Sequence, residues 1–202
     1  MRFPPRRHQP HDPRIEPCCV ERLGGPDAAR LALAAGLARL QAADQLLASV
    51  AEDARRSGDL RNLAQALHLR ANMAADRAWL DEAETLWRES VRLCEQVGDD
   101  LMLAHKVRHL GDVMHRRGQL DDTLRHYARA EALYRAHPPA AGGAQVDLAN
   151  LLIRLAAVRE EQGQTGPALE AWREAKALYV AAGLDVGVED CESHIARLTK
   201  AE

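Results

Sequence analysis

The sequence predicts an all-α protein built as an α-solenoid, a right-handed superhelix of stacked antiparallel helix pairs. Three turn-forming segments recur between amphipathic stretches, beginning at Ala78, Gly118 and Gly163. Each is followed at matching offsets by an aromatic residue, a small residue and a leucine, namely Trp87, Ser90 and Leu93, then Tyr127, Ala130 and Leu133, then Trp172, Ala175 and Leu178. Repeated helix pairs bury their apolar faces against neighbouring copies, so such a chain forms an extended curved surface rather than a closed pocket.

Composition supports the all-α prediction. Of the 202 residues, 47% are hydrophobic but only 3% are aromatic, and alanine supplies much of the apolar content. Alanine favours helix and allows helices to approach closely, whereas the chain lacks the β-branched runs that would predict strands. The length fits one domain of ordinary size.

Charge and cysteine content argue against several classes of partner and site. The formal net charge of -3, from 27 basic and 30 acidic residues, provides no overall field that would attract nucleic acid or a membrane surface. The 4 cysteines show no C-x-x-C spacing, so we assign no metal and predict no cofactor. The N-terminal arginines precede no apolar run, and the apolar stretch at 31–50 carries charged residues. We therefore expect a cytoplasmic protein without a membrane span.

The chain divides into a short arm and one helical domain. Residues 1–26 contain most of the 9 prolines and show no helical period, so this arm is predicted to be disordered. Residues 27–202 form the predicted repeat domain. Its first helix covers 27–56, either as one long helix or as two short ones with a break near Gly36.

Turn signals divide the rest of the domain into repeat units and a cap. Gly58, Gly98 and Gly183 suit the left-handed position that ends a helix, and an aspartate close behind each can cap the next helix. The third unit is longer than the others because residues 138–143 extend a loop. Units are expected at 60–98, 99–138 and 144–183 with a capping helix at 186–200, and their helices near 60–77, 81–97, 100–117, 121–136, 144–162 and 167–182.

The middle unit carries the most specific pattern. Leu110 and Gly111 are followed by a turn at Gly118, an aromatic residue at Tyr127 and a small residue at Ala130. This pattern resembles the tetratricopeptide repeat family, in its bacterial-type variant with units of about 40 residues. The resemblance extends over about 60–200, although arginines at 70 and 159 stand where the family has large apolar residues.

Small residues are expected where the two helices of each unit come closest. A larger side chain at such a position would push the helices apart, because a packed core has no room to relax. The pairs expected to face each other are Ala71 with Ala83, Gly111 with Thr123, and Ala156 with Ala168.

The family resemblance implies a non-catalytic protein–protein interaction module that binds a peptide or protein segment in a concave groove. The first helix of each unit lines this groove in the family, with positions that share one face. Carried over to this chain, the groove residues are Gln65, His68, Asn72, Asp76, His105, Arg108, Asp112, His115, Arg116, Asn150, Ile153, Glu160 and Glu161.

One known use of the family, a clamp on the terminal carboxylate of a partner, fits this chain poorly. The matching positions hold His68, Asn72, Asp112, Asn150 and Arg154. Asp112 would repel a bound carboxylate, so the resemblance does not imply this ligand.

Two alternatives remain open at the level of sequence. The first is a self-assembling homodimer, in which the helix at 27–57 pairs with a second copy through Leu31, Leu33 and Leu37. The second is a metal-dependent regulator or enzyme that uses His68, His105 and His109. The sequence contains no H-E-x-x-H, G-x-S-x-G, G-x-x-x-x-G-K or G-x-G-x-x-G motif, so we expect no catalysis.

Overall fold

A computed structural model describes residues 26–137 and 143–200, and within these ranges every regular element is an α-helix. The helices are α2 (Pro26–Ser57), α3 (Leu60–Asp76), α4 (Leu80–Val97), α5 (Asp100–Arg116), α6 (Leu120–Ala136), α7 (Gly143–Glu161), α8 (Thr165–Ala182) and α9 (Asp185–Thr199). The predicted all-α class and each predicted helix are confirmed, with ends that differ by at most a few residues. The expected disorder of 1–26 and the loop insertion fall almost entirely outside the described residues.

The helix α2 runs through Gly36 without interruption, so the alternative of two short helices is wrong. The chain separates into two compact units, Met1–Ala43 and Asp44–Glu202, and the boundary falls within α2. The packing described below concerns Asp44–Glu202.

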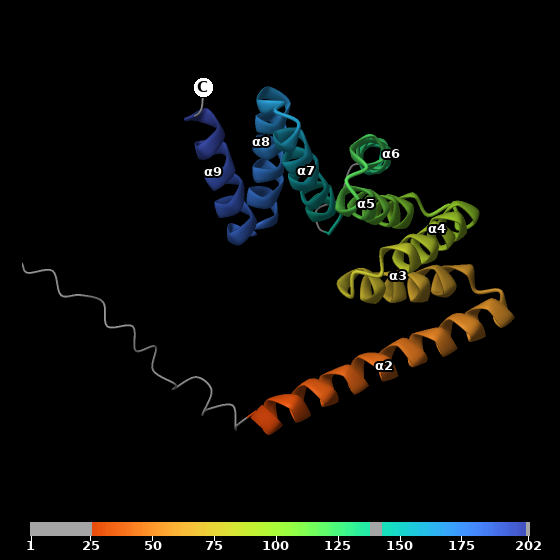
Figure 1. The fold of residues 1–202 in the computed structure, drawn as a ribbon. Coiled ribbons are helices and arrows are strands. Elements are labelled where there is room, and N and C mark those ends of the chain that lie inside the picture. Colours follow the sequence, from red (N-terminus) through yellow and green to blue (C-terminus); the bar gives the residue numbers. More distant parts are fainter. Residues whose placement is uncertain (1–25, 138–142, 201–202) are drawn as a thin grey trace, which may run out of the picture. The chain divides into compact units, whose positions relative to one another are not determined.

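Helices α3 to α9 stack as successive neighbours (Figure 1). The closest pairs are α3 with α4, α5 with α6, and α7 with α8, which are the three predicted repeat units. Contacts between α4 and α5 and between α6 and α7 join the units, and α9 packs on α8 as a cap. The core is continuous along this stack, with Leu67, Trp87, Val107, Tyr127 and Leu151 among its largest buried side chains.

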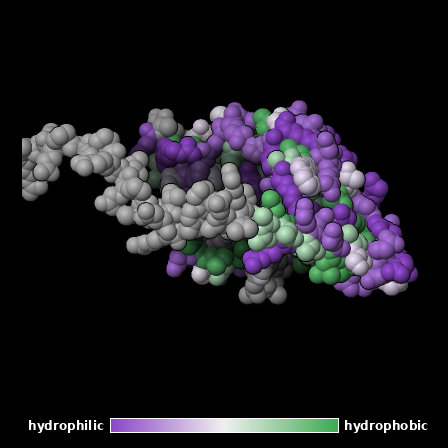
Figure 2. Space-filling model, turned by 60° about the horizontal axis from the view of Figure 1, so that its bottom comes forward, coloured by the Kyte–Doolittle hydropathy of each residue, from purple (hydrophilic) through white to green (hydrophobic). Residues whose placement is uncertain are grey.

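Polar side chains predominate on the face shown in Figure 2, where hydrophobic residues form separate patches. This distribution is typical of amphipathic helices that direct one stripe into the core. Within the described ranges, none of the helices combines the length and the apolar character needed to cross a membrane.

Small residues occupy the helix contacts, as the sequence predicted. Ala71, Ala83, Ala156 and Ala168 have no exposed surface. Gly111 is buried as well, but the group nearest to it is the ring of Tyr127 rather than Thr123. An added Cβ at Gly111 would overlap this ring, lying 2.5 Å from Cδ1 of Tyr127. The middle unit therefore requires glycine at this position.

The turns follow local rules that the sequence signals. Gly58, Gly98 and Gly183 adopt φ values of 73°, 72° and 68°, in the left-handed region that favours glycine. The side chains of Asp59 and Asp99 accept hydrogen bonds from backbone N–H groups in the first turns of α3 and α5. The third expected cap is wrong, because Asp185 is the first residue of α9 and not its N-cap.

Replacing Gly111 with alanine tests the close approach in the middle unit. We expect Gly111→Ala to lower the free energy of unfolding by about 1–3 kcal/mol, because Tyr127 must move to admit the methyl group. Urea denaturation measures the change. Gly36→Ala in α2 is the matched control, because an added Cβ there meets open space within a helix and should be neutral or slightly stabilising. Equal midpoints for the two variants would contradict the assigned contact.

Ala78 has φ = 61° at the turn where the other units have Gly118 and Gly163, both also with positive φ. A residue with a Cβ is strained in this region, and glycine is not. We expect Ala78→Gly to raise the free energy of unfolding by about 0.5–1 kcal/mol. The control Ala177→Gly, at an exposed position within α8, should lower it by a similar amount. Thermal denaturation distinguishes the two signs, and a loss of stability in Ala78→Gly would contradict the strain.

Candidate partner-binding groove

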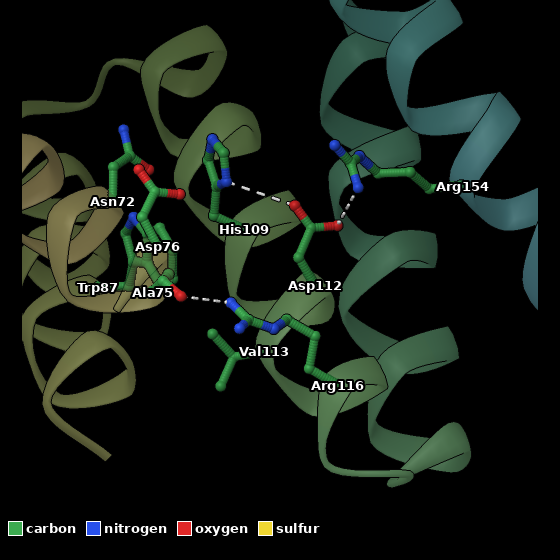
Figure 3. Close-up of a pocket in the computed structure, with 9 residues that line it drawn as sticks. All are labelled: Asn72, Ala75, Asp76, Trp87, His109, Asp112, Val113, Arg116 and Arg154. Atoms are coloured by element: carbon green, nitrogen blue, oxygen red, sulfur yellow. Dashed lines mark hydrogen bonds and ion pairs between the residues drawn. The ribbon is translucent and has the colours of Figure 1, made fainter. Parts of the chain in front are cut away.

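A depression of about 430 Å³ lies over α3, α5 and α7 (Figure 3). It brings together four of the predicted groove residues, Asn72, Asp76, Asp112 and Arg116. Its other lining residues are Ala75, Trp87, His109, Val113 and Arg154. Residues from three successive repeat units therefore line the same depression.

Asp112 is the central charged group of this depression. It accepts a hydrogen bond of 2.7 Å from the hydroxyl of Tyr127 and forms ion pairs with Arg108 at 3.3 Å and Arg154 at 3.4 Å. Its Oδ2 also lies 3.3 Å from Nδ1 of His109. Burial alone would raise the pKa of Asp112, but the hydrogen bond from His109 and the two arginines outweigh it and hold this pKa below its ordinary value. The carboxylate is thus charged and held by both α5 and α7.

The arginines of the groove differ in their exposure. The prediction that Arg108 is an exposed groove residue is wrong. Arg108 is only 5% exposed and forms an ion pair with Asp112 inside the structure. Arg116 is exposed, and its Nη1 donates a hydrogen bond of 2.7 Å to the carbonyl oxygen of Ala75. This carbonyl lies in the last turn of α3 and also accepts a hydrogen bond of 2.9 Å from the backbone N–H of Ala78. Arg116 and Arg154 are therefore the cations that the depression presents to solvent.

Three histidines gather beside the depression. His68 from α3 and His105 and His109 from α5 have ring centroids 4.8–5.1 Å apart, and Trp87 stacks on His109 at 5.0 Å with an interplanar angle of 7°. Burial lowers the pKa of His68 to about 2, with help from the charge of Lys106. Burial also lowers the pKa of His109 to about 4, although its hydrogen bond to Asp112 acts in the opposite direction. Both rings are therefore neutral at pH 7.

The aromatic residue that marks each repeat in the sequence donates a hydrogen bond to a predicted groove residue. Trp87 donates through Nε1 to Nδ1 of His68 at 3.1 Å, and the hydroxyl of Tyr127 donates to Asp112. In the third unit, Trp172 donates through Nε1 to Glu160 at 2.5 Å. Each aromatic side chain thus fills the core of its unit and fixes one polar group on the inner helix.

The remaining predicted residues lie apart from the depression. Gln65 accepts a hydrogen bond of 3.0 Å from the buried Lys106, and His115 pairs with Glu161 at 2.9 Å. Asn150 accepts a hydrogen bond of 2.8 Å from Tyr179. Ile153 packs against the core.

Glu160 is held by the capping helix, because it pairs with His194 at 3.2 Å and with Arg197. The third unit therefore contributes Arg154 to the site rather than the acidic pair at 160 and 161. Arg154 stood among the positions matched to the carboxylate clamp of the family but not in the list of predicted groove residues.

The groove stripe on α5 differs from the predicted one in two residues, because His109 takes the place of Arg108 and His115 is not part of it. His105, His109, Asp112 and Arg116 follow each other at intervals of four, three and four, the spacing of one helix face. Arg108 lies off this stripe toward the core, so strict periodicity would have selected His109 in its place. The contribution of Arg154 had no such local signal.

The matches among solved structures include one chain of similar architecture and two weaker ones. The crystal structure of BtubC (BKLC) from P. vanneervenii resembles this chain with a TM-score of 0.51 at 14% sequence identity, covering 91% of this chain and 89% of that chain. The MamA protein matches with a TM-score of 0.44 at 14% identity over 78% of this chain and 91% of its own. The TPR-like repeats of a putative kinesin light chain from Podosopora anserina match with a TM-score of 0.40 at 12% identity, over 80% and 95%.

No family model matches the sequence, and the comparison with curated proteins also finds no match. The helix pairs, their glycine turns and the likeness to BtubC define the class of the fold. The chain has a tetratricopeptide-like helical repeat fold, and the resemblance inferred from the sequence is confirmed at this level.

Acidification should destabilise the protein through its buried histidines. Below pH 6.5 the unfolded chain takes up protons at His68 and His109 that the folded protein, with lowered pKa values, does not bind. Each histidine should therefore reduce the free energy of unfolding by about 2 kcal/mol between pH 6.5 and pH 5. Urea denaturation at pH 7.5 and 5.0 measures the loss.

The variant His68→Gln should lose about half of this pH dependence, whereas His137→Gln, at an exposed position, should retain it. A free energy of unfolding that does not change between the two pH values would show that these imidazoles remain accessible to protons.

Proposed function

We propose that the chain is a non-catalytic protein-interaction module, and that the depression over α3, α5 and α7 binds an extended segment of a protein partner. The observation that carries this proposal is the pair of exposed cations, Arg116 and Arg154, at the rim of a site in which Asp112 is held by other side chains. A site with prepositioned donors loses little side-chain entropy on binding.

The charges of the site favour a segment rich in acceptor groups. Asp112 is neutralised within the protein by Arg108 and Arg154, so its carboxylate does not stand free against a ligand. Arg116 uses one nitrogen on the carbonyl oxygen of Ala75, and a guanidinium has further N–H donors to offer. Acidic side chains and backbone carbonyl groups of a bound segment are the complementary chemistry. Asn72 adds an amide at the α3 side of the depression.

Charge reversal at the rim tests the proposal. We expect the double variant Arg116→Glu/Arg154→Glu to lose capture of the proteins that the wild type retains from a native lysate, identified by mass spectrometry. Reversing a rim charge mainly slows association and repels the complementary partner. The matched control is Arg92→Glu/Arg173→Glu, at exposed positions on the outer helices α4 and α8, which makes the same change in net charge.

Circular dichroism must show that both double variants remain helical. Loss of capture only in the groove variant supports the proposal. Undiminished capture by a folded groove variant would assign binding to another surface.

Self-association through α2 is a second candidate function. Leu37, Leu40 and Leu46 are 53%, 47% and 66% exposed along this helix. Leu31 and Leu33, also predicted to be exposed, have side chains outside the described set. Exposed leucines on one element favour contact with another apolar surface, and a second copy would supply one. Light scattering of the purified protein distinguishes a monomer from a dimer.

A further inference from the structure

His68, His105 and His109 form the most compact group of metal-ligating side chains in the described part of the chain. One nitrogen from each ring lies within 4.8 Å of the other two. His105 and His109 are one turn apart on α5, and His68 reaches them from α3 in the preceding repeat unit. Stacking of the units therefore assembles a group that neither helix could form alone.

The distance between two of these nitrogens matches that of metal ligands. Nε2 of His105 and Nε2 of His109 are 3.3 Å apart. Two imidazole nitrogens that each lie about 2.0–2.1 Å from a tetrahedral zinc ion are separated by about 3.3–3.4 Å. The α5 pair could thus share one ion with little movement.

A carboxylate lies on the Nδ1 side of each α5 ring, within hydrogen-bond distance for His109 and slightly beyond it for His105. Nδ1 of His109 lies 3.3 Å from Oδ2 of Asp112, and Nδ1 of His105 faces Oδ1 of Asp147 at 3.8 Å. A carboxylate beside Nδ1 keeps the proton of a neutral imidazole on that nitrogen and leaves the lone pair on Nε2. The lone pair of His109 Nε2 is then directed at Nε2 of His105, and a cation between the two nitrogens would replace the hydrogen-bond contact that they make in its absence.

We propose that Nε2 of His105 and Nε2 of His109 chelate a divalent transition-metal ion such as Zn²⁺, with His68 as the third ligand. Imidazole nitrogens are the ligands that zinc, nickel and copper share, and three histidines leave a fourth position for water. The site adjoins the depression through His109 but uses neither rim arginine as a ligand, and it goes beyond the proposed binding of a protein segment.

Three existing hydrogen bonds must give way when the metal binds, one of them the contact of 3.1 Å between Nδ2 of Asn72 and Nε2 of His68. Nη2 of Arg108 lies 3.0 Å from Nε2 of His109, and a ring nitrogen has a single lone pair. The metal therefore displaces this guanidinium from His109. Trp87 donates to Nδ1 of His68, which places the proton of this neutral ring on Nε2. If His68 ligates through Nε2, that proton moves to Nδ1 and the hydrogen bond from Trp87 breaks.

These rearrangements give the site two internal reporters. Trp87 stacks on His109 and bonds to His68, so its fluorescence should change when a metal enters. Arg108 acts as a competitor, so Arg108→Gln should bind the metal more tightly than the wild type. A purely structural role of the histidines would predict neither effect.

The experiment titrates Zn²⁺ into the full chain without an affinity tag, by calorimetry at pH 7.5, and Co²⁺ with visible absorption to report the coordination geometry. We expect one bound ion per chain and a tetrahedral Co²⁺ spectrum. His105→Gln should weaken binding about tenfold or more. It is a suitable first variant because this side chain is 29% exposed and its loss should be tolerated by the fold. His137→Gln, an exposed histidine at the end of α6, should bind like the wild type.

His68→Gln should also weaken Zn²⁺ binding and should abolish the metal-dependent change in Trp87 fluorescence. Absence of Zn²⁺ and Co²⁺ binding to the wild type would overturn the proposal, as would equal affinity in the wild type and folded His105→Gln. Either result would assign the cluster to core packing. The groove experiment would be unaffected, because it depends on Arg116 and Arg154.

Discussion

The contact between the ring of Tyr127 and the backbone of Gly111 joins the packing of this protein to its candidate site. The ring lies where a side chain at Gly111 would have to be, so α6 approaches α5 more closely than any larger residue would allow. This close approach of the two helices allows the hydroxyl of Tyr127 to donate a hydrogen bond to Asp112. Asp112 in turn holds Arg154 of the next unit. The small size of Gly111, which the packing requires, thus helps to fix the position of Arg154 in the groove.

The same relation recurs along the solenoid with different chemistry. Trp87 reaches His68, and Trp172 reaches Glu160. An aromatic residue suits this position because it buries a large apolar area and carries one polar atom at its end. In each unit the aromatic side chain fills the core and donates one hydrogen bond, while the polar group that accepts it differs from one unit to the next. Variation of that group changes the surface without changing the packing.

Charges near the groove divide into groups that hold the structure and groups that face outward. Arg108 and Asp112 form a largely buried pair, and removing one partner of such a pair leaves an uncompensated charge. Arg116 and Arg154 keep exposed donors while they remain anchored to Ala75 and Asp112. The buried pair fixes the position of Arg154 and the backbone of α3 that of Arg116, and fixed charges favour specific recognition on a surface of mixed charge.

The sequence by itself determined the helices, their turns and the small residues between them. These depend on local signals, because apolar periodicity, left-handed glycines and capping aspartates act within a few residues of the chain. Only the tertiary structure decided that Arg108 is buried, that Arg154 joins the groove in place of the acidic pair at 160 and 161, and how close the three histidines lie. Such placements depend on the rotation of one helix pair against the next, which is set by contacts between residues far apart in the sequence and leaves no periodic signal.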